Sequence, residues 1–357
     1  METLKGLILS GGAGTRLRPI THTSAKQLVP VANKPVLFYG IEALVEAGVE
    51  EIGIIIAPET GDEIRVAVGD GSRFGARVTY LPQEAPLGLA HAVLTAEEFL
   101  QDGAFVMYLG DNLLRDGITD LVESFRVSEP DALILLTRVP DPEHYGVAQL
   151  NGEQVVSLIE KPADPPTDLA LVGVYMFGPL IFDAAKAIQP SGRGELEITD
   201  AIQWLIDNDK SVASHTVTGW WKDTGQLDDM LEANRLVLED IERQVDGDLV
   251  DSKVEGRVIV RDGARLERAV VRGPAIIGSG SRITDAYIGP YTSIDRDVTV
   301  ERAEVEHSIL LSGSSVTDLD SRMEASLLGK NVTLCRGATL PKTLRMIVGD
   351  NAEIRIP

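Results

Sequence analysis

Aliphatic residues recur at every sixth position along the last part of the chain, and this period limits the possible folds more than any other feature. The first run of such positions is apolar at seven of eight places: Val258, Ala264, Val270, Ile276, Arg282, Ile288, Ile294 and Val300. A second run, after a ten-residue step, is apolar at six of seven places: Leu310, Val316, Arg322, Leu328, Leu334, Leu340 and Met346. A six-residue period is typical of a parallel β-helix, whose coils stack aliphatic side chains inside a triangular prism. The alternative is a β-sandwich, in which apolar residues alternate at every second position.

A different pattern occupies the first 240 residues, where short apolar runs alternate with segments of helical period. Strands are predicted at residues 7–9, 52–57, 78–81, 104–109 and 132–139, and helices at residues 36–48, 61–68, 88–100 and 118–128. Such alternation is typical of a mostly parallel α/β sheet with helices on both faces. Beyond Tyr145 we expect a hairpin with strands at residues 147–150 and 155–160, followed by helices at residues 179–188 and 197–208. One more strand is expected at residues 212–218 and a long helix at residues 227–244.

Length and composition agree with two globular domains. The chain has 357 residues, 44% of them hydrophobic, and a domain takes about 150 residues. The change of period places the domains at residues 1–244 and 245–357. No apolar run approaches the roughly 18 residues needed to cross a membrane, so we expect no membrane partner. The single cysteine, Cys335, cannot form an intrachain disulfide, and we expect a buried thiol in a cytoplasmic protein.

Charge is unevenly distributed along the chain. The formal net charge is −22, and residues 1–240 hold 17 basic and 37 acidic residues against 16 and 18 in the remainder. A strongly acidic chain repels nucleic acid, so none is expected as a partner. Residues 1–41 are the exception, because five basic residues there accompany a single acidic one. This basic segment predicts a small anion as the ligand.

A glycine-rich segment follows the first predicted strand and contains Gly11, Gly12 and Gly14. Because it leaves the strand at the carboxyl edge of a parallel sheet, its backbone N–H groups can converge on phosphate oxygens without obstruction by Cβ atoms. Arg16 adds a guanidinium group for the same anion. The segment is not a P-loop, since no Gly-Lys-Ser/Thr follows, and Leu17 stands where a dinucleotide fingerprint needs its third glycine. Taken alone, it is equally consistent with a tight strand-to-helix turn.

Several motifs together give the chain a resemblance to a known family. The glycine-rich segment reads G-G-A-G-T-R-L-R-P and is followed by K-Q-L-V-P at residues 26–30. This pairing closely resembles the signature of the sugar-1-phosphate nucleotidyltransferases. Further motifs follow in that family's order: Gly88-Leu89-Ala90, Leu109-Gly110-Asp111-Asn112, Tyr145-Gly146-Val147, Glu160-Lys161-Pro162, Arg193 to Asp200, and Trp221 to Gly225. With the appended hexads, the chain looks like the long form of the family. The resemblance implies a Rossmann-like nucleotidyltransferase domain and a C-terminal left-handed parallel β-helix of hexapeptide repeats.

The resemblance also implies a reaction and its site. The reaction is Mg²⁺-dependent transfer of the dTMP moiety of dTTP to glucose-1-phosphate, which gives dTDP-glucose and pyrophosphate. The nucleotide site would comprise Leu9, Gly11, Gly12, Gly14, Thr15, Arg16, Gln83, Gly88 and Asp111. The sugar-phosphate site would comprise Lys26, Tyr145, Gly146, Glu160, Lys161, Val172 and Arg193. The catalytic residues would be Arg16, Lys26, Asp111, Lys161 and Asp223.

Charge neutralisation and in-line positioning would carry such a reaction, because two polyanions must meet. Arg16 would hold the triphosphate, and Lys26 would contact oxygens of the α-phosphate or of the sugar phosphate. Asp111 and Asp223 are candidate metal ligands, since Mg²⁺ prefers one or two carboxylates together with phosphates and water. The alternative for each aspartate is a cap of a turn.

The remaining expectations concern the base and the sugar. The amide of Gln83 can form two hydrogen bonds with a pyrimidine edge, and Gly88 lets the ring lie against backbone. Glu160 would accept hydrogen bonds from sugar hydroxyls, and Lys161 would meet the sugar phosphate. The alternative for this pair is a solvent-exposed pair of charges at a strand end.

Two rival functions remain open. One is the same chemistry with UTP, because one methyl group on the base is worth only about 1–3 kcal/mol in an apolar pocket. The other is a regulatory or assembly subunit without turnover, although the five catalytic candidates are all present. His307 in the hexad region is interpreted as structural, since no other feature of a second activity accompanies it. A homo-oligomer is expected because the faces of a β-helix are otherwise unpaired.

Overall fold

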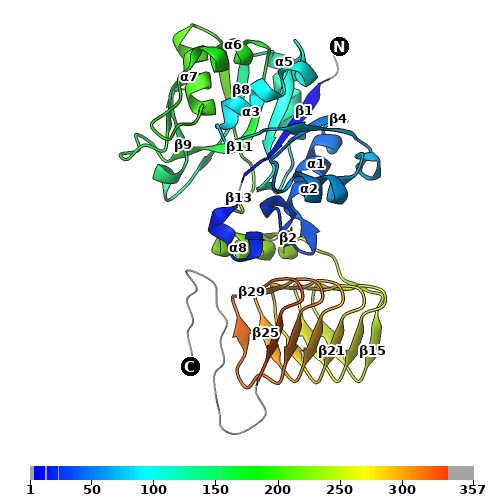
Figure 1. The fold of residues 1–357 in the computed structure, drawn as a ribbon. Helices are drawn as coiled ribbons and strands as arrows, with labels where there is room; N and C mark the ends of the chain where they lie inside the picture. Colours follow the sequence, from blue (N-terminus) through cyan, green and yellow to red (C-terminus); the bar gives the residue numbers. More distant parts are fainter. Residues whose placement is uncertain (1–3, 13, 23, 153, 337–357) are drawn as a thin grey trace. The chain divides into compact units, whose positions relative to one another are not determined.

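The computed structural model describes residues 4–12, 14–22, 24–152 and 154–336. Its contacts divide the chain into two compact units (Figure 1). The first unit comprises residues 1–14, 24–29 and 34–225, and the second comprises residues 15–23, 30–33 and 226–357. This division differs from a boundary at residues 244 and 245, because helix α8 (Leu227–Glu239) packs with the second unit. Among the described residues, no helix has the length and apolar character needed to cross a membrane.

A mixed sheet forms the centre of the first unit and has nine strands within the described residues. The main path has the order β10-β9-β11-β6-β1-β4-β5, and β8 joins β11 to β12. The strands are β1 (Lys5–Ser10), β4 (Glu51–Ile56), β5 (Arg77–Pro82), β6 (Phe105–Leu109), β8 (Ala132–Arg138), β9 (Gly146–Asn151), β10 (Gln154–Glu160), β11 (Leu169–Phe177) and β12 (Val212–Thr216). The pairs of β1 with β4 and β6, of β4 with β5 and of β8 with β12 are parallel, as the alternating pattern predicts. The neighbours of β11 run antiparallel to it, so the sheet is mixed.

Helices cover both faces of this sheet because its strands are apolar on both sides. Ile8 of β1 and Tyr108 of β6 belong to one core cluster, whereas Leu7 and Met107 belong to another. The first cluster includes residues of α1 (Val36–Glu46), α2 (Gly61–Val68) and α5 (Thr119–Ser128). The second includes residues of α3 (Leu89–Thr95), α4 (Glu97–Leu100), α6 (Leu180–Ala187) and α7 (Ile198–Asp207). The two clusters hold the sheet rigid, so that its carboxyl ends can position a site.

Besides short strands that were not predicted, the structure differs from the predicted elements in three longer segments. Strand β11 was not predicted, because it lies beyond Tyr145, where strands and helices no longer alternate regularly along the sequence. The helix predicted at residues 88–100 is two helices, α3 and α4, which meet at Ala96. The helix predicted to reach residue 244 ends at Glu239, since strand β14 (Gln244–Val245) begins the first coil of the β-helix.

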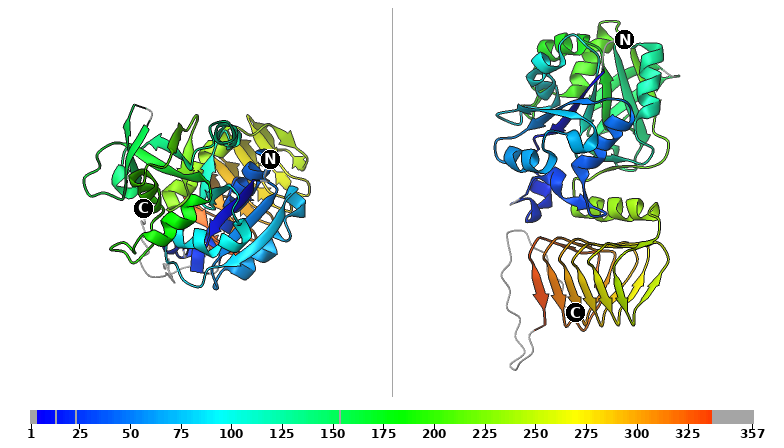
Figure 2. Two further views of the ribbon diagram at one scale, coloured as in Figure 1. Left: turned by 90° about the horizontal axis from the view of Figure 1, so that it is seen from above. Right: turned by 90° about the vertical axis from the view of Figure 1, so that its right-hand side faces the viewer.

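Within the described residues, the second unit contains three parallel sheets of short strands, which stack as successive coils of a β-helix (Figure 2). One sheet consists of β14, β17 (Val258–Val260), β20 (Ala275–Ile277), β23 (Thr292–Ile294), β26 (Ile309–Leu310) and β29 (Leu327–Leu328). The next consists of β15 (Asp248–Val250), β18 (Arg265–Glu267), β21 (Arg282–Thr284), β24 (Thr299–Glu301), β27 (Ser315–Thr317) and β30 (Thr333–Cys335). The third consists of β16 (Lys253–Glu255), β19 (Val270–Arg272), β22 (Tyr287–Ile288), β25 (Glu304–Glu306) and β28 (Met323–Glu324).

The six-residue period is only approximate in the structure. Val258 pairs with Ala275 and Ala275 with Thr292, so each of these coils advances by 17 residues and a strict hexad drifts out of register. Ile288, Ile294 and Val300 are fully buried as predicted, whereas Arg282 and Arg322 are exposed. Cys335 is also exposed, contrary to the expected buried thiol. The hexad positions at residues 340 and 346 lie outside the described residues.

Asn234 of α8 joins three separate segments of the second unit. Its Oδ1 atom accepts hydrogen bonds from the backbone N–H of Ala32 (2.9 Å) and the hydroxyl of Ser293 (2.6 Å), and its Nδ2 atom donates to the carbonyl of Tyr291 (3.0 Å). Its side chain is fully buried. Because a buried amide without partners is costly, this residue fixes the turn at residues 30–33 against α8 and the coils.

Candidate active site

The chain leaves β1 in the glycine-rich turn. Leu9 is buried at the end of the strand, and Gly11 and Gly12 follow it. A Cβ atom on Gly11 would lie 3.3 Å from Oε1 of Gln83, and Gly14 has a φ of +61°. The turn therefore needs small residues where it passes the Gln83 amide.

Three charged side chains of the first unit meet beyond the end of β6. Lys26, in the short 3₁₀ segment Lys26–Leu28, is buried, and its Nζ atom lies 2.5 Å from Oδ2 of Asp111 and 3.8 Å from Oδ1 of Asp223. The sequence predicted a phosphate as the partner of Lys26 and a metal as the partner of the two aspartates. In the structure the ammonium group lies against both carboxylates, because opposite charges pair when they are withdrawn from water.

A small two-stranded sheet brings the two aspartates together. Strand β7 (Asn112–Leu114) pairs with β13 (Trp221–Asp223), and Asn112 lies opposite Asp223 in the register. The backbone N–H and hydroxyl groups of Thr224 both donate to the carbonyl of Asp111, at 3.0 and 2.8 Å. The turn after β6 and the turn after β13 are thereby held side by side.

Electrostatics keep Asp111 ionised at this position. Burial alone would raise the pKa of the carboxyl group. The charge and hydrogen bond of Lys26 and the amide of Asn112 lower the pKa by a larger amount, so it lies below its ordinary value. The amide of Asn112 donates to Oδ1 of Asp111 at 2.9 Å. An anionic Asp111 beside Asp223 is suited to bind a cation.

Asn112 is a site residue that sequence reasoning missed, although it lies in one of the recognised motifs. Its buried Oδ1 atom accepts hydrogen bonds from Nε1 of Trp221 (2.6 Å) and the N–H of Gly173 (3.3 Å). Trp221 also makes an edge-to-face contact with Tyr145, with ring centroids 5.4 Å apart. Asn112 therefore connects the aspartate pair to β11 and to the start of β9.

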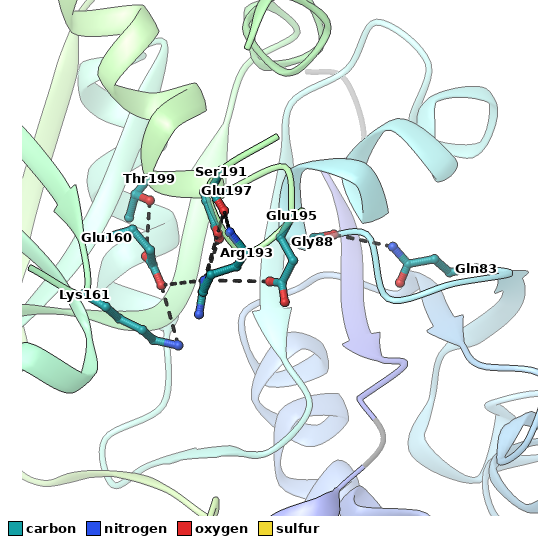
Figure 3. Close-up of polar contacts among 9 residues, drawn as sticks. All are labelled: Gln83, Gly88, Glu160, Lys161, Ser191, Arg193, Glu195, Glu197 and Thr199. Carbon is teal, nitrogen blue, oxygen red and sulfur yellow. Dashed lines mark hydrogen bonds and ion pairs between the residues drawn. The ribbon is translucent and has the colours of Figure 1, made fainter. Parts of the chain in front are cut away.

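A second polar cluster surrounds Glu160 at the end of β10 (Figure 3). Its carboxylate accepts hydrogen bonds from the Arg193 guanidinium and the Thr199 hydroxyl, each at 3.2 Å, and lies 3.7 Å from Nζ of Lys161. Gly146 lies opposite Glu160, and a Cβ atom there would come within 2.7 Å of Thr199. Gly146 is therefore required by close packing in this cluster.

Arg193 is surrounded by carboxylates (Figure 3). Besides Glu160, its Nη2 atom lies 2.9 Å from both carboxylate oxygens of the buried Glu197 and 3.7 Å from Glu195. The Ser191 hydroxyl also donates to Glu197, at 2.7 Å. Sequence reasoning assigned Arg193 to a sugar phosphate and gave Glu197 no role, because one sequence cannot separate the charges of this run.

Burial and neighbouring charges together set the pKa values in this cluster. For Glu160, burial raises the pKa above its ordinary value, with Glu197 adding to the effect and with Lys161 and Arg193 opposing it. For Arg193, burial lowers the pKa, but the three carboxylates reverse this effect and leave the pKa above its ordinary value. The cluster contains two cations and three carboxylates, so it offers more hydrogen-bond acceptors than free positive charge.

A third group lies in the loop between β5 and α3. The buried Gln83 has its Nε2 atom 3.4 Å from the carbonyl of Gly88 and 2.9 Å from Nδ1 of His91. The peptide of Leu196 bridges this loop to the Arg193 cluster, since its N–H donates to the carbonyl of Leu87 (2.8 Å) and its carbonyl accepts from Ala90 (3.0 Å). The loop that carries Gln83 is thus connected to the chain between Glu195 and Glu197.

Three predicted residues have a different environment. Thr15 and Arg16 are exposed in the 3₁₀ segment Thr15–Leu17, which belongs to the second unit. Val172 is fully buried in the hydrophobic core, so its side chain packs between the sheet and its helices. Only backbone groups of Val172 could contact a ligand.

Comparison with known proteins identifies the family of the chain. The model of the Nucleotidyl transferase family matches residues 5–240. The chain belongs to the nucleotidyl transferase family. Among the relatives of this nucleotidyl transferase, the glucose-1-phosphate thymidylyltransferases of Streptomyces griseus and Streptomyces antibioticus are 54% and 52% identical over 356 residues, 99% of each chain. A solved Bacillus anthracis chain, assigned by name to the same enzymes and complexed with a sucrose, is 35% identical with a TM-score of 0.63 and covers 68% of this chain and 97% of its own.

Proposed function

We propose that the chain transfers the dTMP moiety of dTTP to glucose-1-phosphate and releases pyrophosphate. The observation that carries this proposal is the convergence of Lys26, Asp111 and Asp223 beyond the carboxyl end of β6. That edge of a parallel sheet is where α/β proteins bind phosphates. Relatives that match over the whole chain carry the name of this activity.

The two aspartates fit a divalent cation, which the family generally uses, and we propose Mg²⁺. Both carboxylates reach the same cationic atom, Nζ of Lys26, and carboxylate oxygens are the ligands that Mg²⁺ prefers. Among the described residues, no group of three or more His, Cys, Asp or Glu side chains could hold a metal. Phosphate oxygens and water would therefore complete the coordination. When bound, the metal would supply neutralisation of the phosphate charge.

The chain's own residues would bring an oxygen of the sugar phosphate in line with the α-phosphorus of dTTP. Lys26 would exchange its carboxylate partners for phosphate oxygens, and Arg16 would hold the triphosphate. We place the sugar hydroxyls at the carboxylates around Glu160 and Arg193, because this cluster has more acceptors than free cations. Lys161, whose side chain is half exposed, remains the candidate for the sugar phosphate.

Pyrophosphate release tests the proposal. We expect turnover with dTTP and glucose-1-phosphate when dTTP, UTP, CTP and ATP are each combined with several sugar phosphates. Faster turnover with UTP would assign the rival substrate, and no turnover with any pair would favour a regulatory subunit. Asp111→Asn and Asp223→Asn should each lower turnover by at least about a hundredfold, since they remove an anionic ligand at constant size.

A control variant separates the metal site from general charge effects. Asp120 on α5 is exposed, so Asp120→Asn removes the same charge elsewhere on the first unit and should leave turnover unchanged. Excess Mg²⁺ should restore only part of the activity of Asp111→Asn. If either site variant turned over at the wild-type rate, that aspartate would be a turn cap.

We further propose that the protein is a cytoplasmic homo-oligomer. Leu249 and Val250 of β15 are exposed in the first coil of the β-helix. Exposed aliphatic side chains on parallel strands are suited to contact a second copy. Light scattering of the purified chain would show a single mass above the 38.5 kDa of one chain.

A further inference from the structure

His91 contacts the one side chain proposed to read the base, and the geometry assigns the direction of that contact. Nε2 of Gln83 lies 3.4 Å from the carbonyl oxygen of Gly88, which can only accept a hydrogen bond. The nitrogen of the amide must therefore be the atom on this side. The same Nε2 lies 2.9 Å from Nδ1 of His91, so Nδ1 must accept the second hydrogen of the amide.

The imidazole is thereby restricted to one form. A neutral imidazole carries one hydrogen, and since Nδ1 accepts, this hydrogen must be on Nε2. Rotating the amide of Gln83 by half a turn would place its oxygen against the Gly88 carbonyl, which is an acceptor in every case, and against Nδ1, which is an acceptor while the imidazole carries its hydrogen on Nε2. The Gly88 carbonyl therefore opposes the rotated orientation, and His91 opposes it in this tautomer.

The acceptors themselves are fixed in place. Gly88 precedes α3 with a φ of +105°, and the Leu196 peptide is hydrogen-bonded to Leu87 and Ala90 on either side of it. His91 lies on α3 itself, where its carbonyl accepts a hydrogen bond from the Thr95 hydroxyl at 3.0 Å. The two acceptors that orient the Gln83 amide, one a backbone carbonyl and one the His91 side chain, are thus both carried by hydrogen-bonded backbone.

The remaining polar atom of the amide is Oε1, which lies at the glycine-rich turn beside Gly11. An oxygen accepts from a base that carries hydrogen on N3, as thymine and uracil do. Cytosine presents a lone pair at N3, so that two acceptors would face each other.

We propose that His91 is a positioning residue that fixes the Gln83 amide, and that this selects pyrimidines with hydrogen on N3 against cytosine. The inference rests on the proposed function and extends it to the basis of nucleotide selection. The selectivity would come from the hydrogen bond between Gln83 and His91, which lies outside the base site, because His91 need not touch the ligand.

The test compares the dissociation constants of dUTP and dCTP by calorimetry, because these nucleotides both lack the methyl group and differ only at this edge. The wild type should prefer dUTP. His91→Ala removes one of the two fixed acceptors and should lower the preference by about tenfold or more. His91→Lys replaces the acceptor with a donor and should lower it further, whereas His91→Gln can still accept and should retain it. A control, His215→Ala on β12, should leave the preference unchanged.

A spectroscopic measurement keeps the inference testable if a variant fails to fold. In wild-type protein with ¹⁵N-labelled histidine, the resonances lost in His91→Gln should report hydrogen on Nε2 and a bare Nδ1. Hydrogen on Nδ1, or an unchanged preference in both His91→Ala and His91→Lys, would overturn the role of His91. If the wild type bound neither dTTP nor dUTP, the proposed function itself would fail.

Discussion

Replacement of Gly88 by alanine should disturb the base loop and the Arg193 cluster together. A Cβ atom at this position would lie 2.3 Å from the carbonyl oxygen and 2.7 Å from the nitrogen of Leu196. The Leu196 peptide cannot move away freely, because its N–H and carbonyl are hydrogen-bonded to Leu87 and Ala90. Gly88 also has φ and ψ values of 105° and 169°, a region that is essentially restricted to glycine.

The magnitude follows from these two effects. The backbone conformation costs alanine about 1–3 kcal/mol, and loss of the two Leu196 hydrogen bonds costs about 1 kcal/mol each. The total of roughly 3–5 kcal/mol should lower the midpoint of thermal unfolding of a domain of this size by roughly 6–20 °C. Affinity for dTTP should also fall by about tenfold or more, since the acceptor that orients Gln83 is displaced.

Thermal unfolding and calorimetric titration with dTTP would measure both effects. Gly192→Ala is the matched control, because no atom lies within 4 Å of the Cβ position of Gly192. It should keep the unfolding midpoint and the affinity of the wild type. If Gly88→Ala were as stable as this control, or if it bound dTTP with wild-type affinity, the Leu196 peptide would not be the rigid link inferred here.

The remaining predictions concern stability. Because burial raises the pKa of Glu160, the folded state binds more protons than the unfolded state above the ordinary pKa of a glutamate, and stability falls as pH rises through this window. Glu160→Gln should therefore raise the free energy of unfolding more at about pH 8 than at about pH 5, as measured by urea titration; an equal change at both pH values would contradict this. Asn234→Ala should lower the free energy of unfolding by about 2–5 kcal/mol, since the buried Ala32 N–H and Ser293 hydroxyl lose their partner. Asn208→Ala, which removes one exposed hydrogen bond, should cost much less, and equal losses would refute the role of Asn234.

The elements that could be predicted from sequence are those in which one period dominates. Strands β1, β4 and β6 and helices α1, α2 and α5 show the expected alternation, and the hexads predict the β-helix. Strand β11 was missed although β1, β4 and β6 are equally buried, because those strands are short apolar runs between segments of helical period, whereas β11 lies beyond Tyr145, where this alternation ends. The advance of 17 residues per coil could not be recognised either. Three hexads span 18 residues, so a six-residue period stays close to the true register over several strands.

Motifs named three residues that the structure brings together, but not how these residues are paired. Lys26, Asp111 and Asp223 were all identified, but their mutual contact depends on the pairing of β7 with β13. No local pattern encodes a pairing between segments more than a hundred residues apart. Glu197 was equally hidden, because its position before the apolar α7 gives no sign that it binds Arg193.

The discontinuous second unit has a consequence for synthesis on the ribosome. The turn at residues 30–33 bonds to Asn234 and to Ile294, which lie 202 and 261 residues further along the chain. At about 5–20 residues per second, this early turn waits roughly 10–50 seconds for its partners. The second unit must therefore remain incomplete, with the turn at residues 30–33 open to proteases or chaperones, until most of the β-helix has left the exit tunnel.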